Sequence, residues 1–242
     1  MTDINRTHIT AVLDRSGSMR ALESDTIGGF NKFLEDQKAT EGEATLTLVL
    51  FDDHYDVPHL SKNIKEIPEL TNKLYFARGM TALYDALGKA IIDTGIALAA
   101  LPEDQRPGTV IVLVMTDGEE NSSKEFGGEE GRQRVQAMVK TQTEVYKWSF
   151  VFMGANIDAK AVGASLGVAA AQALNYTSDS HGTRSAYEAM SSGTKGLRDH
   201  TRTKGALGRT KFVDDPDAVI GGPVLNNTKI SGTPPTNTPT SK

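Results

Sequence analysis

The 242-residue chain contains no cysteine, so disulfide bonds, zinc–thiolate sites and thiol catalysis are excluded. It also lacks any run of about 18 apolar residues that could form a transmembrane helix. The first ten residues are polar, without the apolar core of a secretory signal. We therefore expect a cytoplasmic protein with no membrane partner, whose chemistry comes from oxygen and nitrogen groups.

The chain also has no excess of basic residues. The chain has 26 Lys and Arg against 31 Asp and Glu, a formal net charge of −5. This charge argues against general attraction to phosphate backbones, so we expect no nucleic-acid partner. The length is enough to bury one sizeable core.

Strand-like and helix-like segments alternate along the chain. Apolar, β-branched runs predict strands at 8–13, 45–51, 55–60, 109–115, 149–153 and 173–177. Apolar residues at helical spacing predict helices at 19–38, 65–75 (a turn or two only), 81–101, 129–147, 158–166 and 183–200. The alternation predicts an α/β fold, a doubly wound and mostly parallel sheet with helices on both faces. The segment 55–60 is expected to be an antiparallel edge.

The composition changes near residue 203 to Gly, Pro, Thr, Asn and Ser. Such a segment buries too little apolar surface to offset its ordering entropy. We expect one domain at 1–202 and a flexible C-terminal tail at 203–242.

The segment LDRSGSM places one carboxylate and two hydroxyls at alternate positions directly after the first predicted strand, at Asp14, Ser16 and Ser18. Hard oxygen ligands with this spacing can hold a Mg²⁺-type cation. Taken alone, the pattern fits equally well a helix cap, with Ser16 or Ser18 capping a helix that begins at Met19.

Further oxygen ligands occur at two other predicted element ends. Asp117 follows the strand 109–115, and Thr81 opens the helix 81–101. In an open α/β sheet, ligands bind at the carboxyl ends of strands where the strand order reverses, so these loops are expected to converge on Asp14. Alone, Asp117 would indicate a turn and Thr81 a helix cap. Together the residues predict a Mg²⁺ or Mn²⁺ site with an open position.

Other polar residues near these loops have simpler interpretations. Arg15, between the predicted ligands, could contact a partner carboxylate or pair with a local acid. Asp52, Asp53 and His54 could hold a second metal, although a hairpin turn is the preferred interpretation. Asp85 is expected to hydrogen-bond a loop.

With these residues in place, the sequence resembles a von Willebrand factor A (VWA) domain. The metal-ion-dependent adhesion site (MIDAS) of that family combines D-x-S-x-S with a distant Thr and a distant Asp. The matching residues, in order, are Asp14, Ser16, Ser18, Thr81 and Asp117. The resemblance covers about residues 6–200, excludes the tail, and is closest to compact stand-alone versions of bacteria and their phages.

The resemblance implies six strands in the order 3-2-1-4-5-6. It also implies Mg²⁺ or Mn²⁺ bound directly by the three hydroxyls, with the two aspartates acting through water. An Asp or Glu of a partner protein would complete the site. We place the partner-binding rim at Arg15, Met19, Met80 and Glu119. Some family members pair with an AAA+ ATPase, and a virion protein is a further candidate partner, with a virion-associated location if the chain is phage-encoded.

The main competing class is a Mg²⁺-dependent phosphohydrolase of the haloacid dehalogenase type. Such enzymes need a second acid two residues after the nucleophilic Asp, and here that position is Ser16. A phosphate-binding G-x-x-x-x-G-K-[ST] loop is also absent. The sequence therefore favours a non-catalytic binding module, with a structural or assembly component as the alternative.

Overall fold

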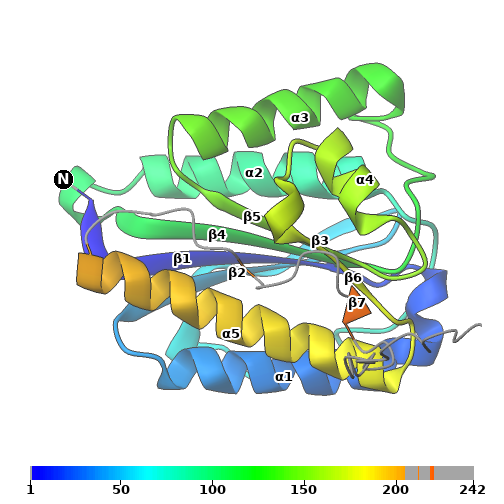
Figure 1. Cartoon of the computed structure of the whole chain (residues 1–242), viewed down its shortest axis with the longest axis horizontal. Coiled ribbons are helices and arrows are strands. Elements are labelled where there is room, and N and C mark those ends of the chain that lie inside the picture. The colour runs from blue at the N-terminus through cyan, green and yellow to red at the C-terminus, as the bar shows by residue number, and fades with distance from the viewer. Residues whose placement is uncertain (1, 205–211, 213–218, 221–242) are drawn as a thin grey trace, which may run out of the picture.

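A seven-stranded sheet forms the centre of the computed structural model, which describes residues 2–204, 212, 219 and 220 (Figure 1). The strand order is β3-β2-β1-β4-β5-β6-β7, and every neighbouring pair is parallel except the antiparallel pair β2–β3. The strands are β1 (Asp3–Asp14), β2 (Glu43–Phe51), β3 (Tyr55–Asn63), β4 (Pro107–Thr116), β5 (Ser149–Gly154), β6 (Ala173–Tyr176) and β7 (Val219–Ile220).

Helices cover both faces of this sheet. One face carries α1 (Glu23–Ala39) and α5 (Ser180–Lys204) (Figure 1). The other face carries α2 (Leu83–Ala99), α3 (Gly128–Glu144) and α4 (Ala159–Ser165). Four short 3-10 turns complete the described elements: η1 (Gly17–Leu22), η2 (Ile64–Glu66), η3 (Glu103–Gln105) and η4 (Ala170–Gln172).

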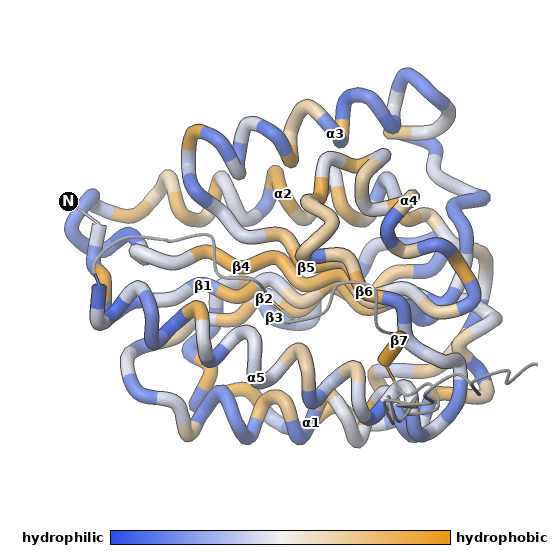
Figure 2. The backbone as a smooth tube through the Cα atoms, viewed as in Figure 1, coloured by the Kyte–Doolittle hydropathy of each residue, from blue (hydrophilic) through white to orange (hydrophobic). Residues whose placement is uncertain are grey.

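Two apolar cores lie on opposite faces of the sheet because side chains alternate along each strand. In β1, Leu13 packs in the core beneath α1 and α5, whereas Val12 packs in the core beneath α2 and α3. The central strands β4 and β5 are therefore apolar at most positions, and Figure 2 shows them largely in orange. This is the arrangement expected of a parallel sheet covered on both faces, and it confirms the predicted α/β class.

The register between β1 and β4 positions the predicted metal site. Leu13 pairs with Met115 in the parallel ladder, so Asp14 and Thr116 follow side by side at the carboxyl ends of the two strands. Asp117 comes next in the chain. The two aspartates predicted as metal ligands are thus brought to the same edge of the sheet.

One detail of the predicted architecture is corrected: the described sheet has seven strands rather than six, because Val219–Ile220 pairs with β6. The turn or two of helix expected around 65–75 is present as the 3-10 turn η2, which begins one residue earlier. Pro68 explains its early end, since a proline disfavours helical geometry in the preceding residue, and Ile67 is extended (φ −77°, ψ 122°).

The predicted tail at 203–242 lies mostly outside the described residues. Residues 203 and 204 belong to α5. Phe212 is buried in the core beside α5, where a Cβ added to Gly193 would lie 2.5 Å from its ring. Within the described residues, no helix is long and apolar enough to cross a membrane.

Candidate metal site

Asp14 ends β1 as a fully buried carboxylate. Its Oδ1 accepts a hydrogen bond from the Ser16 backbone N–H at 2.6 Å, and its Oδ2 accepts one from the Thr116 hydroxyl at 2.5 Å. The first bond folds the loop after β1 back over the strand end. The second bond joins β1 to β4 at the site.

Ser16 and Ser18 bring their hydroxyls together above Asp14. The two Oγ atoms lie 3.0 Å apart, and the Ser18 hydroxyl donates to Oδ1 of Asp117 at 2.5 Å. Ser16 occupies the cap position of η1 but makes no side-chain capping bond. The helix-cap interpretation of this motif was therefore wrong for Ser16, and both hydroxyls face the other predicted ligands.

Thr81 reaches the same place from the loop before α2. Its N–H donates to the side-chain oxygen of Asn121 at 2.8 Å, and its carbonyl accepts from the N–H of Asn121 at 3.0 Å. The cap position of α2 is Ala82 and not Thr81, so the helix-cap interpretation of Thr81 was wrong. The Thr81 hydroxyl is therefore not used to cap the helix.

Gly118 shows how closely the three hydroxyls gather. A Cβ added to Gly118 would lie 3.1 Å from the Thr81 hydroxyl oxygen, 3.4 Å from that of Ser18 and 3.9 Å from that of Ser16. The three oxygens thus surround one small space that a glycine leaves free. The structure brings all five predicted ligands together.

The site holds two acids without a cationic side chain. Burial raises the pKa of Asp14 to about 6, although hydrogen bonds from Thr116 and Ser16 oppose the rise. Burial also raises the pKa of Asp117. No lysine, arginine or histidine of the described residues forms an ion pair with either acid. Buried charges are normally paired or bound to metal, so these two carboxylates and three neutral oxygens suit a divalent cation.

The surface around the site is open at Ser18, which is exposed together with Gly17. Met80 (55% exposed) and Glu119 also lie at the surface, as expected of a rim. Two rim residues are corrected. Met19 is fully buried, because η1 turns it into a small apolar cluster with Leu22 and Ala77.

Arg15 is the second correction, since its side chain is only 3% exposed. It pairs with Asp52 and Asp56, which answers the question left open by the sequence in favour of a local acid. Asp85, as expected, binds a loop, and it accepts the backbone N–H groups of Lys124, Glu125 and Phe126.

Among the described residues, Asp52, Asp53 and His54 are the one group of three His and acidic residues whose ligand atoms lie within 4.8 Å of one another. Here the acids have cationic partners. Asp52 accepts from the Nε atoms of Arg15 and Arg78 at 2.9 and 2.6 Å. Its charge is thus balanced by the chain itself, unlike that of Asp14.

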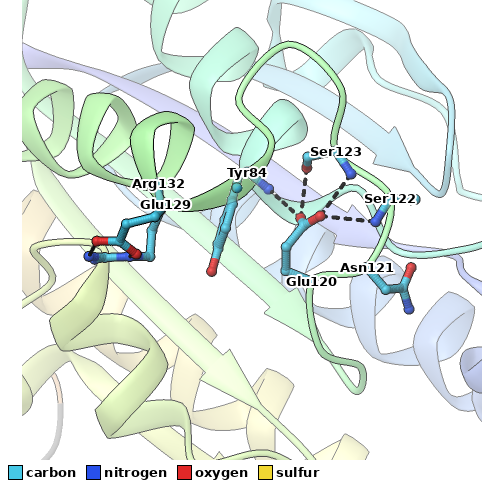
Figure 3. Close-up of a pocket in the computed structure, with 8 residues that line it drawn as sticks. Tyr84, Glu120, Asn121, Ser122, Ser123, Glu129 and Arg132 are labelled. Atoms are coloured by element: carbon cyan, nitrogen blue, oxygen red, sulfur yellow. Dashed lines mark hydrogen bonds and ion pairs between the residues drawn. The ribbon is translucent and has the colours of Figure 1, made fainter.

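A pocket of about 380 Å³ lies beside the site, between the loop after β4, Tyr84 of α2 and the start of α3 (Figure 3). Glu120 points into this loop and accepts the N–H groups of Tyr84, Ser122 and Ser123 (Figure 3). This carboxylate therefore holds the loop that carries Asn121 against Thr81. Its hydrogen bonds explain its position without a ligand.

The supporting roles of three residues, Thr116, Asn121 and Asp52, were not predicted from the sequence, where Asp52 was considered only as a ligand of a second metal. Thr116 stands directly before Asp117 at the end of an apolar run, which is a usable signal once the strand pairing is known. Asn121 and Asp52 gave no such signal, because their partners are distant in the chain and depend on how three loops meet.

No protein-family model and no curated protein matches the chain. Solved structures do match its fold. The PilB minor pilin from Streptococcus sanguinis (D319A mutant) is 10% identical with a TM-score of 0.58 over 83% of this chain. A von Willebrand factor type A protein from Catenulispora acidiphila is 13% identical (TM-score 0.50, 79% of this chain), and proximal thread matrix protein 1 from the mussel byssus is 15% identical (0.50, 80%).

The chain has a VWA-like fold. It spans 64%, 43% and 47% of the lengths of these three structures, in the order given. This similarity concerns the sheet and its helices. The support for the five-residue site is its own geometry in this structure.

Proposed function

We propose that the chain is a divalent-metal-dependent protein-binding module. Mg²⁺ or Mn²⁺ would be held by Asp14, Ser16, Ser18, Thr81 and Asp117, as in a MIDAS. The observation that carries the proposal is the pair of buried carboxylates that lack a cationic side chain beside three converging hydroxyls. A bound dication supplies a positive charge that an Asp or Glu of a partner protein can coordinate.

The chain's own residues divide this task between them. Asp14 and Asp117 provide the negative charge that favours a dication over a monovalent ion. The three hydroxyls provide neutral oxygens and leave part of the cation's charge uncompensated. Ser18 is exposed, so the partner carboxylate approaches from its side, past Met80 and Glu119. We place the chain in the cytoplasm, or on a virion if it is phage-encoded.

A non-catalytic role is part of this proposal. Asp14 is fully buried, and both its oxygens accept hydrogen bonds, so it is poorly placed for nucleophilic attack on a phosphoryl group. A phosphatase activity that Asp14→Asn abolishes would overturn this part.

Isothermal titration calorimetry with Mn²⁺ and Mg²⁺ tests the metal site directly. We expect one ion per chain in the wild type and none in Asp14→Ala, with Glu119→Ala as a control that keeps the site. Equal binding by wild type and Asp14→Ala would refute the site. Capture of partner proteins with and without EDTA then tests whether binding depends on the metal.

An assembly component, as part of a virion or beside an AAA+ ATPase, is the second candidate. Two structures with the same fold are a minor pilin and a thread matrix protein. At 10% and 15% identity they show the fold alone, so this candidate rests on a weaker observation. Sedimentation of the purified chain with Mg²⁺ and with EDTA tests this candidate, because large species formed by the chain alone are expected of a self-assembling component and not of a binding module.

A further inference from the structure

Asp52 lies buried between the two loops that carry predicted metal ligands. Its side chain is fully buried at the turn after β2. Its Oδ2 accepts from Nε of Arg15 at 2.9 Å and from Nε of Arg78 at 2.6 Å. Arg15 directly follows Asp14, and Arg78 precedes Thr81 by three residues. One carboxylate oxygen therefore joins both loops.

The backbone of the same residues strengthens this connection. The Asp52 carbonyl accepts the N–H of Ala82, which directly follows Thr81, at 2.9 Å. The Arg15 carbonyl accepts the N–H of Arg78 at 2.8 Å. The segment 78–82 is thus held on both sides of Thr81, in each case by Asp52 or by its arginine partner.

The loop has little room to adjust if this support is lost. Gly79 has a φ of +67°, and a Cβ added there would lie 2.1 Å from Oδ1 of Asp53. The Gly79 carbonyl also accepts the N–H of Gly17 at 3.2 Å, within the loop of Ser16 and Ser18. Tight packing of this kind passes a displacement of Arg78 on to Thr81 instead of absorbing it.

The remaining oxygen of Asp52 is occupied as well. Its Oδ1 accepts the N–H of His54 at 2.6 Å and lies 3.1 Å from Nδ1 of the same residue. With two arginines on Oδ2 and His54 on Oδ1, the charge of Asp52 is already compensated within the protein, unlike that of Asp14, which fits a structural carboxylate better than a metal ligand. The contacts point towards the predicted site at Thr81, not towards a second site at His54.

We propose that Asp52 is a positioning residue that places the Thr81 hydroxyl for the metal, through Arg15 and Arg78. This inference rests on the proposed function. Removing the Asp52 charge leaves two guanidinium groups without their shared acceptor, so the loop shifts and the Thr81 hydroxyl with it. Residues that orient metal ligands typically change affinity by about 10- to 100-fold when mutated.

A double-mutant cycle tests this role. The Mn²⁺ affinities of Asp52→Asn, Thr81→Val and the double variant are measured by calorimetry and by the electron paramagnetic resonance spectrum of bound Mn²⁺. Asp56→Asn is the matched control, because Asp56 pairs with the same two arginines but is 52% exposed. Arg78→Gln, whose side chain is 40% exposed, repeats the cycle should Asp52→Asn fail to fold.

We expect Asp52→Asn and Arg78→Gln each to weaken Mn²⁺ binding at least about tenfold when introduced into the wild type. When introduced into the Thr81→Val variant, each should weaken it less than about twofold. The spectra of Asp52→Asn and Thr81→Val should match, and Asp56→Asn should bind as the wild type does. Equal loss with and without the Thr81 hydroxyl would overturn the positioning role, as would unchanged affinity in Asp52→Asn. A wild type that binds no Mn²⁺ would overturn the proposed function as well, so the two failures are distinguishable.

Discussion

The Thr116 hydroxyl donates a 2.5 Å hydrogen bond to Oδ2 of Asp14, so a neutral donor faces a fully buried carboxylate. An arginine or lysine at this point would satisfy Asp14 and leave no reason for a metal. The neutral partner keeps the negative charge of β1 available at the edge of the sheet.

Asp14→Asn should stabilise the metal-free protein. Burial raises the pKa of Asp14 from 3.8 to about 6, so ionisation costs the folded state up to about 3 kcal/mol at pH 7. In EDTA, the wild type should gain stability as the pH falls through about 6, and the variant should lack this gain. Urea unfolding at pH 7 should show a higher free energy of unfolding for the variant.

The same variant should lose its response to metal. Saturating Mg²⁺ at 100 times its Kd should stabilise the wild type by about 2.7 kcal/mol and Asp14→Asn not at all. If Mg²⁺ stabilises both proteins equally, it binds elsewhere on the chain.

Metal binding should weaken in acid. A proton on Asp14 competes with the cation, and with a pKa of about 6 the ionised fraction falls about tenfold between pH 7 and pH 5. We expect the Mn²⁺ association constant to fall by at least the same factor, as measured by calorimetry at constant ionic strength. A constant affinity across this range would mean that Asp14 takes no part in binding.

Gly118→Ala should damage the site with little effect on the fold. The added methyl group would lie 3.1 Å from the Thr81 hydroxyl oxygen and 3.4 Å from that of Ser18, so it would enter the space between them. We expect Mn²⁺ affinity to fall about tenfold or more while the free energy of unfolding in EDTA changes by less than about 1 kcal/mol. Gly28→Ala is a suitable control, because nothing lies within 4 Å of a Cβ there.

His54→Ala should leave the metal stoichiometry at one ion per chain. Asp52 is already neutralised by Arg15 and Arg78, so the cluster with Asp53 and His54 offers a cation little uncompensated charge. Calorimetry with Mn²⁺ measures the number of ions. Two ions in the wild type and one in His54→Ala would instead assign a second site to this cluster.

Sequence patterns were sufficient, for a physical reason, to predict six of the seven described strands and to bring the five candidate ligands to one edge of the sheet. Apolar runs of strand length place Asp14 and Asp117 at strand ends, and parallel strands bring their carboxyl ends to one edge. The burial of Arg15 and Met19 could not be read in the same way. The burial of each side chain depends on the path of a short loop. A motif of alternating residues does not indicate which side chains point into the core.

The supporting contacts were harder to predict still. Thr116 meets Asp14 only because Leu13 pairs with Met115, and a shift of one residue would turn the hydroxyl to the other face. Asp52 and Arg78 are 26 residues apart and meet through a loop without regular structure. The seventh strand is two residues long, too short for any periodic pattern to reveal it.

The two edges of the described sheet discourage growth by strand addition. β3 contains Pro58, the left-handed Ser61 (φ 49°) and two register shifts against β2, while β7 has only two residues. Such irregular or short edges offer no long row of free backbone groups for another molecule to join. The edges formed by the described residues should therefore not support backbone pairing between copies of this protein. Contacts between copies along the described edges would then be made by side chains, and where they include the proposed cation a chelator should separate the subunits without unfolding them.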